Sequence, residues 1–353
     1  MTYERFGRYT VLDSLGTGGM ATVHRATIDI GGGVVREVAL KRLLPQFADD
    51  KALVEDFVRE AKLAAQLQHP NIVRILELGR TGPTYFIAME LVHGHSLLAL
   101  MKLVVGRRSL VPVGIVVAIL TEVLDALDYA GNATDGFGEP LEIVHRDLSP
   151  SNIIVTHDGH IKIIDFGVAK SVTGTFTTSS GLVKGKLGYM AGEVLAGKPI
   201  DRRADIFSLG VVAWELLAGR RLFVGKNEHD VVAKIRMGAT TPPSKLNPAC
   251  PPELDEIVMH ALSRKRADRW PSAAIMRFAL DSLRRTYRQT VRDIAAWSRT
   301  LAPEPFLEET TTSEILTGDL VPIRASSSRL SYTTMVDSEE VADDANLDDT
   351  SQD

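Results

Sequence analysis

The chain has 353 residues, 44% of them hydrophobic and 24% charged, which is typical of a globular protein and excludes fibrous and wholly disordered classes. This length favours two lobes or domains over one compact unit. The net charge of −5 is unevenly spread. Residues 301–353 carry thirteen acidic side chains and two arginines, which leaves residues 1–300 at about +6.

Three features bear on location and partners. Cys250 is the single cysteine, which excludes a disulfide framework and favours a reducing compartment. The first ten residues are charged and lack an apolar core, unlike a secretory signal, and the longest apolar run, Val111–Leu120, is too short to span a bilayer. No run of Lys and Arg is interleaved with aromatic residues. We therefore expect a cytoplasmic protein with neither nucleic-acid nor membrane partners.

The first predicted elements, between residues 9 and 92, are mainly strands. Apolar residues at helical spacing between Val54 and Leu67 predict one helix among them, which must end before Pro70. Apolar stretches broken by glycine turns predict strands at Tyr9–Leu15, Val34–Leu40, Ile72–Leu78 and Tyr85–Leu91.

Helical patterns dominate from about residue 93. The clearest are Val113–Ala130 and the almost wholly apolar IFSLGVVAWELLA at 206–218, which is typical of a buried central helix and ends at Gly219. Amphipathic segments predict further helices near 230–237, 253–262 and 271–285. Beyond about residue 303 the chain is acidic, rich in Ser and Thr and poor in aromatic residues, which predicts disorder.

The first chemical motif is a glycine-rich turn between two predicted strands. Glycines let backbone amides approach phosphate oxygens closely, although such turns are common and indicate little by themselves. The turn comprises Leu15, Gly16, Thr17, Gly18, Gly19, Met20, Ala21, Thr22 and Val23. Lys41 ends the following apolar strand, where its ammonium can reach a phosphate, and Glu60 on the predicted helix can pair with it. Taken singly, both residues read equally well as solvated surface charges.

Two further motifs place polar residues directly after short apolar strands. Residues 143–155 read IVHRDLSPSNIIV, and residues 161–167 read IKIIDFG. Asp147, Asn152 and Asp165 thus supply hard oxygen ligands or proton acceptors at loop positions.

In order and spacing, these motifs, together with D-x-F-S-x-G from Asp205, resemble those of eukaryotic-type serine/threonine protein kinases, the bacterial members above all. The resemblance covers residues 9–285. It implies an α+β, protein kinase-like two-lobed fold, with a small β-rich N-lobe containing one helix at 1–92 and a mainly helical C-lobe at 93–290. Residues 291–353 would form an acidic tail, disordered beyond about 303. It also implies phosphorylation of serine or threonine in proteins, autophosphorylation, and ATP with Mg²⁺, or alternatively Mn²⁺, as cofactors.

The resemblance assigns roles to the catalytic residues. Lys41 would bind the α- and β-phosphates, held in place by Glu60, while the amides of residues 16–21 cover the phosphates. Asn152 and Asp165 would ligate the metal ion. Asp147 would orient the acceptor hydroxyl and take its proton.

It also implies an adenine site and a scaffold. Adenine would lie between Val23 and Ala39 on one side and Ile154 on the other, near the backbones of Glu90 and Val92 and the side chain of Met89. The scaffold roles fall to three residues: Arg269 would pair with Glu193, Asp205 would cap the catalytic loop, and His145 would be a packed structural residue.

The sequence departs from the family at a few positions. Ala21 replaces the third glycine of the turn, and Gly192 replaces the proline before Glu193. Ser149 stands where the family has a lysine, and Lys186 where it has a threonine. We expect the Lys186 ammonium to fill the space of the missing lysine, binding Asp147 and the transferred phosphate, with Ser149 accepting a bond from it.

Two other functions remain open from these residues. A pseudokinase scaffold could bind nucleotide or partner proteins with the same fold, although Lys41, Glu60, Asp147, Asn152 and Asp165 are all retained. A small-molecule kinase would not be expected to carry the long segment 167–193 or Arg269. In that segment we predict a regulatory phosphorylation, favouring Thr177 and Thr178, with Arg146 as the partner of the phosphate.

Overall fold

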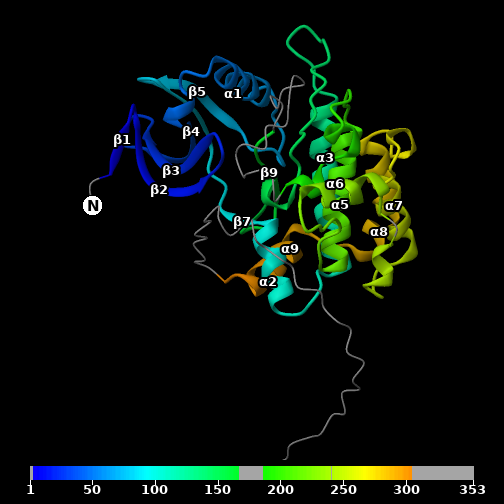
Figure 1. The fold of residues 1–353 in the computed structure, drawn as a ribbon. Helices are drawn as coiled ribbons and strands as arrows, with labels where there is room; N and C mark the ends of the chain where they lie inside the picture. The colour runs from blue at the N-terminus through cyan, green and yellow to red at the C-terminus, as the bar shows by residue number, and fades with distance from the viewer. Residues whose placement is uncertain (1–2, 167–185, 240, 304–353) are drawn as a thin grey trace, which may run out of the picture. The chain divides into compact units, whose positions relative to one another are not determined.

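The computed structural model describes residues 3–166, 186–239 and 241–303 (Figure 1). A sheet-rich N-lobe is followed by a helical C-lobe. The strands are β1 (Glu4–Phe6), β2 (Tyr9–Thr17), β3 (Ala21–Asp29), β4 (Val35–Leu43), β5 (Ile75–Thr81), β6 (Thr84–Glu90), β7 (Gly94–Ser96), β8 (Ile153–Thr156) and β9 (Ile161–Ile163). The helices are α1 (Lys51–Ala64), α2 (Leu97–Gly106), α3 (Val113–Gly131), α4 (Gly192–Leu195), α5 (Arg203–Ala218), α6 (Glu228–Met237), α7 (Pro252–Ala261), α8 (Ala273–Tyr287) and α9 (Val291–Leu301).

The N-lobe is one antiparallel sheet in the order β1-β2-β3-β4-β6-β5, with α1 packed near β5. Two small cores, one on each face, hold it together; Leu40 belongs to one and Phe57 of α1 to the other. Asp50 caps α1 by accepting a hydrogen bond from the Leu53 amide, which satisfies a donor that the first turn leaves free. The strands and the helix predicted in this region are therefore present, with ends shifted by a few residues.

The C-lobe is built around α5. Every residue of α5 from Ala204 to Ala218 is buried, as its almost wholly apolar sequence predicts, and Gly219 ends it in the left-handed conformation. Helices α3 and α7 pack against α5, and α8 packs against α3 (Figure 1). No helix in the described ranges is both long and apolar enough to be a membrane span.

A second, three-stranded sheet, β7-β8-β9, carries the catalytic motifs. Residues 150–152 form a short 3-10 helix that runs directly into β8, and the Asp165 motif follows β9. An isolated parallel bridge joins Ile72 to Ile163, which attaches this sheet to the chain just after α1. The two catalytic motifs therefore lie side by side because their strands pair.

Helices α2 and α9 were not predicted. Ser96 caps α2 at the Ala99 amide, and Thr290 with Asp293 forms a capping box at the start of α9. Buried Ile294, Ala295, Ser298 and Leu301 fix α9 against α2, α3 and β8. Residues 291–301, assigned above to the acidic tail, are thus an ordered part of the helical lobe.

Candidate active site

Lys41 lies at the centre of an ion-pair network between the lobes. Its Nζ atom is 3.0 Å from Glu60 Oε1 on α1 and 2.9 Å from Asp165 Oδ1 beyond β9. Lys41 and Glu60 are only 7% and 6% exposed. Burial alone would lower the pKa of Lys41, but the carboxylates of Asp165 and Glu60 outweigh it and raise the pKa above its ordinary value. The lysine therefore stays charged in a buried position, as binding of phosphate requires.

Asp147 and Asn152 form a second group on the catalytic loop. The Asn152 Nδ2 atom donates to the backbone oxygen of Asp147 at 2.8 Å and to Asp147 Oδ2 at 3.2 Å. Lys186, from the far side of the segment 167–185, places its Nζ atom 2.8 Å from Asp147 Oδ2 and 3.4 Å from Asn152 Oδ1. The structure thus brings together the carboxylate, the amide and the ammonium that the sequence separates by up to 39 positions.

Asp205 of α5 holds the backbone of the catalytic loop. Its two carboxylate oxygens accept the amides of His145 at 2.7 Å and Arg146 at 2.9 Å. Burial raises the pKa of Asp205 to about 6, against the effect of these amides. Fully buried His145 accepts the Asp147 amide at Nδ1, so its Nε2 atom carries the proton that faces the Ile164 carbonyl. Asp205 and His145 thus occupy scaffold positions in the structure.

Two functional positions have positive φ although they are not glycine. Arg146 has φ 64° and Asp165 has φ 53°. Such a conformation disfavours most side chains by about 1 kcal/mol or more and concentrates at functional sites. The surrounding hydrogen bonds of Asp205 and Lys41 hold these two residues in place.

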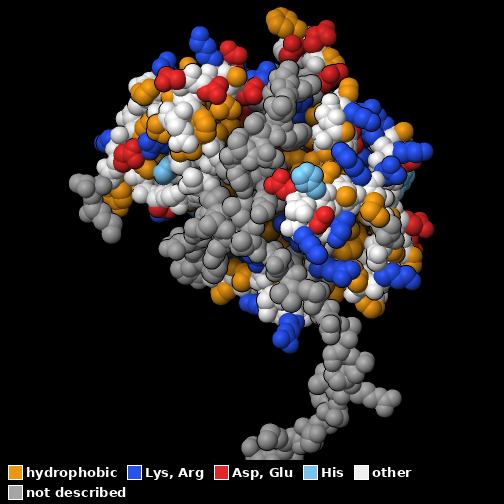
Figure 2. All heavy atoms as spheres, viewed as in Figure 1, with side chains coloured by type: hydrophobic (Ala, Val, Ile, Leu, Met, Phe, Trp, Pro, Cys, Tyr) orange, Lys and Arg blue, Asp and Glu red, His pale blue; other side chains and the backbone are white. Residues whose placement is uncertain are grey.

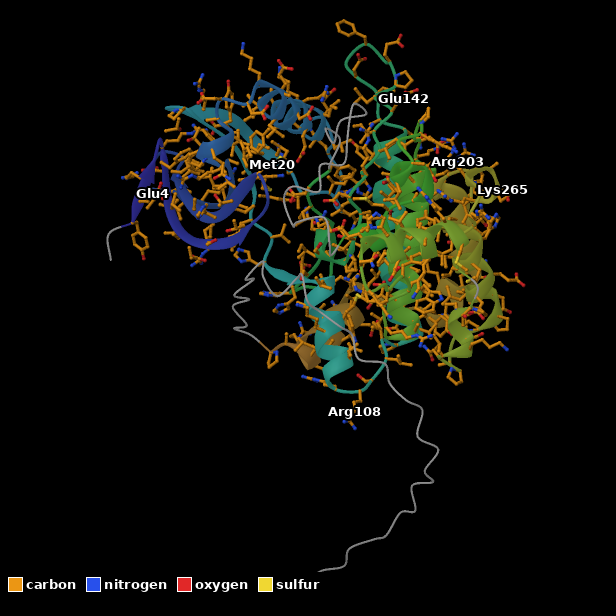
Figure 3. All side chains as sticks on the ribbon, viewed as in Figure 1. Glu4, Met20, Arg108, Glu142, Arg203 and Lys265 are labelled. Carbon is orange, nitrogen blue, oxygen red and sulfur yellow. The ribbon has the colours of Figure 1, made fainter. Side chains whose placement is uncertain are left out.

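The glycine-rich turn joins β2 to β3. Met20, labelled in Figure 3, lies in the turn, and the Gly18 amide donates to the Ala21 carbonyl at 2.8 Å. Ala21 begins β3, is buried and is not among the residues with positive φ, so its methyl group is compatible with the turn.

The predicted adenine walls come from three strands and the chain beyond β6. Ala39 and Val23 lie on paired strands, β4 and β3, and Ile154 lies on β8. Met89 lines a cavity with Lys41, Glu60, Val73, Asp165 and Phe166. The Glu90 amide already donates to Arg74 O at 2.9 Å, so this amide is engaged within the protein.

The carboxylate of Asp165 and the amide oxygen of Asn152 fit a hard divalent cation that takes its remaining ligands from phosphate and water. Burial would raise the pKa of Asp165, but Lys41 outweighs it and keeps the pKa below its ordinary value. This donor set suits a divalent metal ion that arrives with a nucleotide.

The departures from the family have distinct structural outcomes. Gly192 is the first residue of α4, the helix position at which proline is favoured for its fixed φ. Next to it, Glu193 forms two hydrogen bonds with buried Arg269, of 2.6 and 2.9 Å.

Ser149 does not bind Lys186: its hydroxyl lies 2.9 Å from that of Ser151. The expected Ser149–Lys186 bond is therefore absent from the described contacts, and the Ser149 hydroxyl pairs with Ser151 instead.

One buried polar cluster was not anticipated. Tyr189 donates to Glu215 Oε2 at 2.7 Å, and Arg221 binds both. A lone glutamate within the apolar sequence of α5 was the available signal, because a buried carboxylate requires partners. A second unanticipated bond joins Lys162 to Glu90. Gly167, Thr177 and Thr178 lie outside the described residues.

Comparison with known proteins agrees with this geometry. Residues 9–279 match the protein kinase domain family. The tyrosine-protein kinase MasK of Myxococcus xanthus is 40% identical over 79% of this chain and 43% of its own length. The serine/threonine-protein kinase PrkC of Bacillus subtilis is 34% identical over 76% of this chain and 39% of its own.

A further relative and a solved structure extend the comparison. The serine/threonine-protein kinase PknA of Mycobacterium tuberculosis is 34% identical over 79% of this chain and 62% of its own. This chain therefore spans less than two thirds of each of these three relatives. The crystal structure of the Mycobacterium tuberculosis PknI kinase domain superposes with a TM-score of 0.58 at 30% identity, covering 80% of this chain and 98% of that one. The chain belongs to the protein kinase family, with its sheet-rich N-lobe and helical C-lobe.

Proposed function

We propose that the chain is an ATP-dependent serine/threonine protein kinase, which also phosphorylates itself. The observation that carries this proposal is the joint placement of Lys41 with Glu60 and Asp165, and of Asp147 with Asn152. A pseudokinase scaffold has no comparable support, because all five of these side chains are retained and contact one another in two groups.

The reaction follows from the positions of these side chains. The acceptor oxygen forms a bond to the γ-phosphorus as the bond from that phosphorus to the β–γ bridging oxygen breaks, and ADP departs with the bonding electrons. Asp147 orients the acceptor hydroxyl and takes its proton, while Lys41 offsets the charge of the α- and β-phosphates. Mg²⁺, or alternatively Mn²⁺, supplies positive charge at the phosphates when held by Asp165 and Asn152.

The acceptor amino acid is the finer part of the proposal. PrkC and PknA are named serine/threonine kinases, which supports hydroxyl groups of serine and threonine. MasK, at 40% identity, is named a tyrosine kinase, so tyrosine is the second candidate. Cys250 is a buried free thiol, and together with the need for ATP it supports a cytoplasmic location.

The test compares the wild-type chain with Asp147→Asn for transfer of ³²P from ATP, followed by phosphoamino-acid analysis. We expect labelled serine and threonine in the wild type. Asp147→Asn should retain ATP binding but lose transfer, because it removes the proton acceptor and no phosphate ligand.

Two outcomes would contradict the proposal. Phosphotyrosine alone would reassign the acceptor. A variant with more than about a tenth of wild-type turnover, a barrier change under roughly 1.4 kcal/mol, would reject Asp147 as the proton acceptor.

A further inference from the structure

Lys186 is a charged side chain of the site that comes from outside the glycine-rich turn, β4, α1 and the two catalytic motifs. Its Nζ atom approaches both Asp147 and Asn152, and its charge also helps to lower the pKa of Asp165. The Lys186 side chain is 31% exposed and that of Asp147 is 10% exposed. An ammonium group thus lies between the proton acceptor and the proposed metal ligands, partly screened from solvent.

The place of Lys186 is fixed by the C-lobe core rather than by the catalytic loop. The Tyr189 amide donates to Lys186 O at 3.0 Å, and buried Tyr189 is anchored through its hydroxyl to Glu215 and through its carbonyl to Ser208 Oγ, at 2.7 and 2.8 Å. Both anchors belong to α5, the buried central helix. The backbone that carries the ammonium is therefore held three residues away by rigid contacts.

The catalytic loop itself has no cation at position 149, where the family has a lysine. Ser149 is 2% exposed, and its hydroxyl pairs with Ser151. Lys41 is engaged by Glu60 and Asp165 on the other side of the site. Phosphoryl transfer spreads negative charge over the oxygens of the moving group, and a fixed cation facing them lowers the barrier.

We propose that Lys186 is a catalytic residue of this kinase: its ammonium holds Asp147 Oδ2 and faces the phosphoryl group as it moves to the acceptor. Lys186 takes no proton and forms no covalent bond in the step written above. The inference rests on the proposed function and names the residue that supplies the cation missing at position 149.

The test uses Lys186→Ala and Lys186→Arg, with Lys198→Ala as the matched control, in the full chain. Lys198 is an exposed lysine of the same lobe. Three quantities are measured: kcat, the Kd for ATP, and the Kd for ADP in the presence of aluminium fluoride, which mimics the transferring phosphoryl group.

We expect Lys186→Ala to lower kcat by about 10- to 1000-fold, equivalent to roughly 1.4–4 kcal/mol, with the Kd for ATP within about threefold of wild type. Binding of ADP with aluminium fluoride should weaken by about tenfold or more, because only the transition state gains from the ammonium. Lys186→Arg should recover part of the kcat, and the Lys198→Ala control should stay within about threefold of wild type.

A kcat for Lys186→Ala within about threefold of wild type would overturn the inference, as would equal losses in ATP binding and in binding of the mimic. The proposed function fails separately, if the wild-type chain transfers no phosphate or if Asp147→Asn is as active as wild type. A second experiment exchanges the pair, since Ser149→Lys with Lys186→Thr moves the cation to the catalytic loop. This double variant should exceed Lys186→Thr alone by at least about tenfold in kcat, and no gain would contradict the exchange.

Discussion

At the scale of single residues, the site depends on charges that burial would otherwise remove. Lys41 keeps its charge because two carboxylates offset its desolvation, and Asp165 keeps its charge because of Lys41. Asp205 differs, since burial outweighs the effect of its two backbone amide donors and of the Arg146 charge, and its pKa rises to about 6. Asp205 therefore titrates at a pH at which the stability of the protein can be measured.

Asp205→Asn should change how stability depends on pH. The folded pKa of about 6 exceeds the ordinary 3.8, so the folded protein binds more protons than the unfolded chain between about pH 4 and 6. Within this window the Asp205 contribution to the free energy of unfolding falls as pH rises, by roughly 3 kcal/mol in total. Asparagine does not titrate. The free energy of unfolding of the wild type minus that of the variant, measured by urea titration, should therefore fall as pH rises from 4 to 6. If the free energies of unfolding of the two proteins changed with pH in parallel, the raised pKa of Asp205 would be rejected.

At the scale of elements, α9 joins the catalytic sheet to the end of the helical lobe. Arg107, at the C-terminus of α2, donates to the carbonyls of Thr300 and Leu301 at 2.6 and 2.8 Å. These carbonyls end α9, and a cation near the C-terminus of a helix is stabilising. At the other end, the backbone of α9 meets the β8–β9 turn at Gly159, which has φ +92°. A Cβ atom there would lie 1.8 Å from Val291 O, so the contact requires glycine.

Gly159→Ala should therefore destabilise the protein more than a matched glycine change. Gly138 has nearly the same φ, +87°, with no atom within 4 Å of its added Cβ, so Gly138→Ala carries the backbone strain without the clash. We expect Gly159→Ala to lower the free energy of unfolding by roughly 1–3 kcal/mol more than Gly138→Ala, as overpacking does. Trp297 of α9 can report local undocking by its fluorescence. Equal losses in both variants would show that α9 does not require this close approach.

At the scale of the whole molecule, basic and acidic side chains are concentrated in different parts of the chain. Lys and Arg side chains gather over the helical lobe on the face shown in Figure 2, whereas residues 301–353 carry thirteen acidic side chains against two arginines. Within the described residues, the last members of the buried core of the helical lobe are Leu301 and Ala302. From the acidic, Ser- and Thr-rich composition of residues 304–353, we predict that the folded unit is complete at about residue 303.

Two truncations test this boundary. A chain that ends at Pro303 should keep its Tm within about 2 °C and its kcat within about twofold, although its net charge changes from −5 to about +6. A chain that ends at Thr290 also loses α9 and its buried apolar side chains, and should melt several degrees lower. Equal Tm values for the two truncated chains would place the end of the folded unit before α9.

The sequence by itself determined the strand-rich first lobe, the buried helix α5 and the order of the catalytic motifs, because these follow from local periodicity and from residue types at fixed spacing. It did not reveal α9, whose residues it assigned to the acidic tail, nor the partner of Ser149. The approach of Lys186 to Asp147, 39 positions apart, is expected from the residues at positions 149 and 186 and is present in the structure. Tertiary structure decided α9 and the partner of Ser149, because these depend on how helices pack and on which side chains meet in the folded loop, and no local pattern encodes such distances.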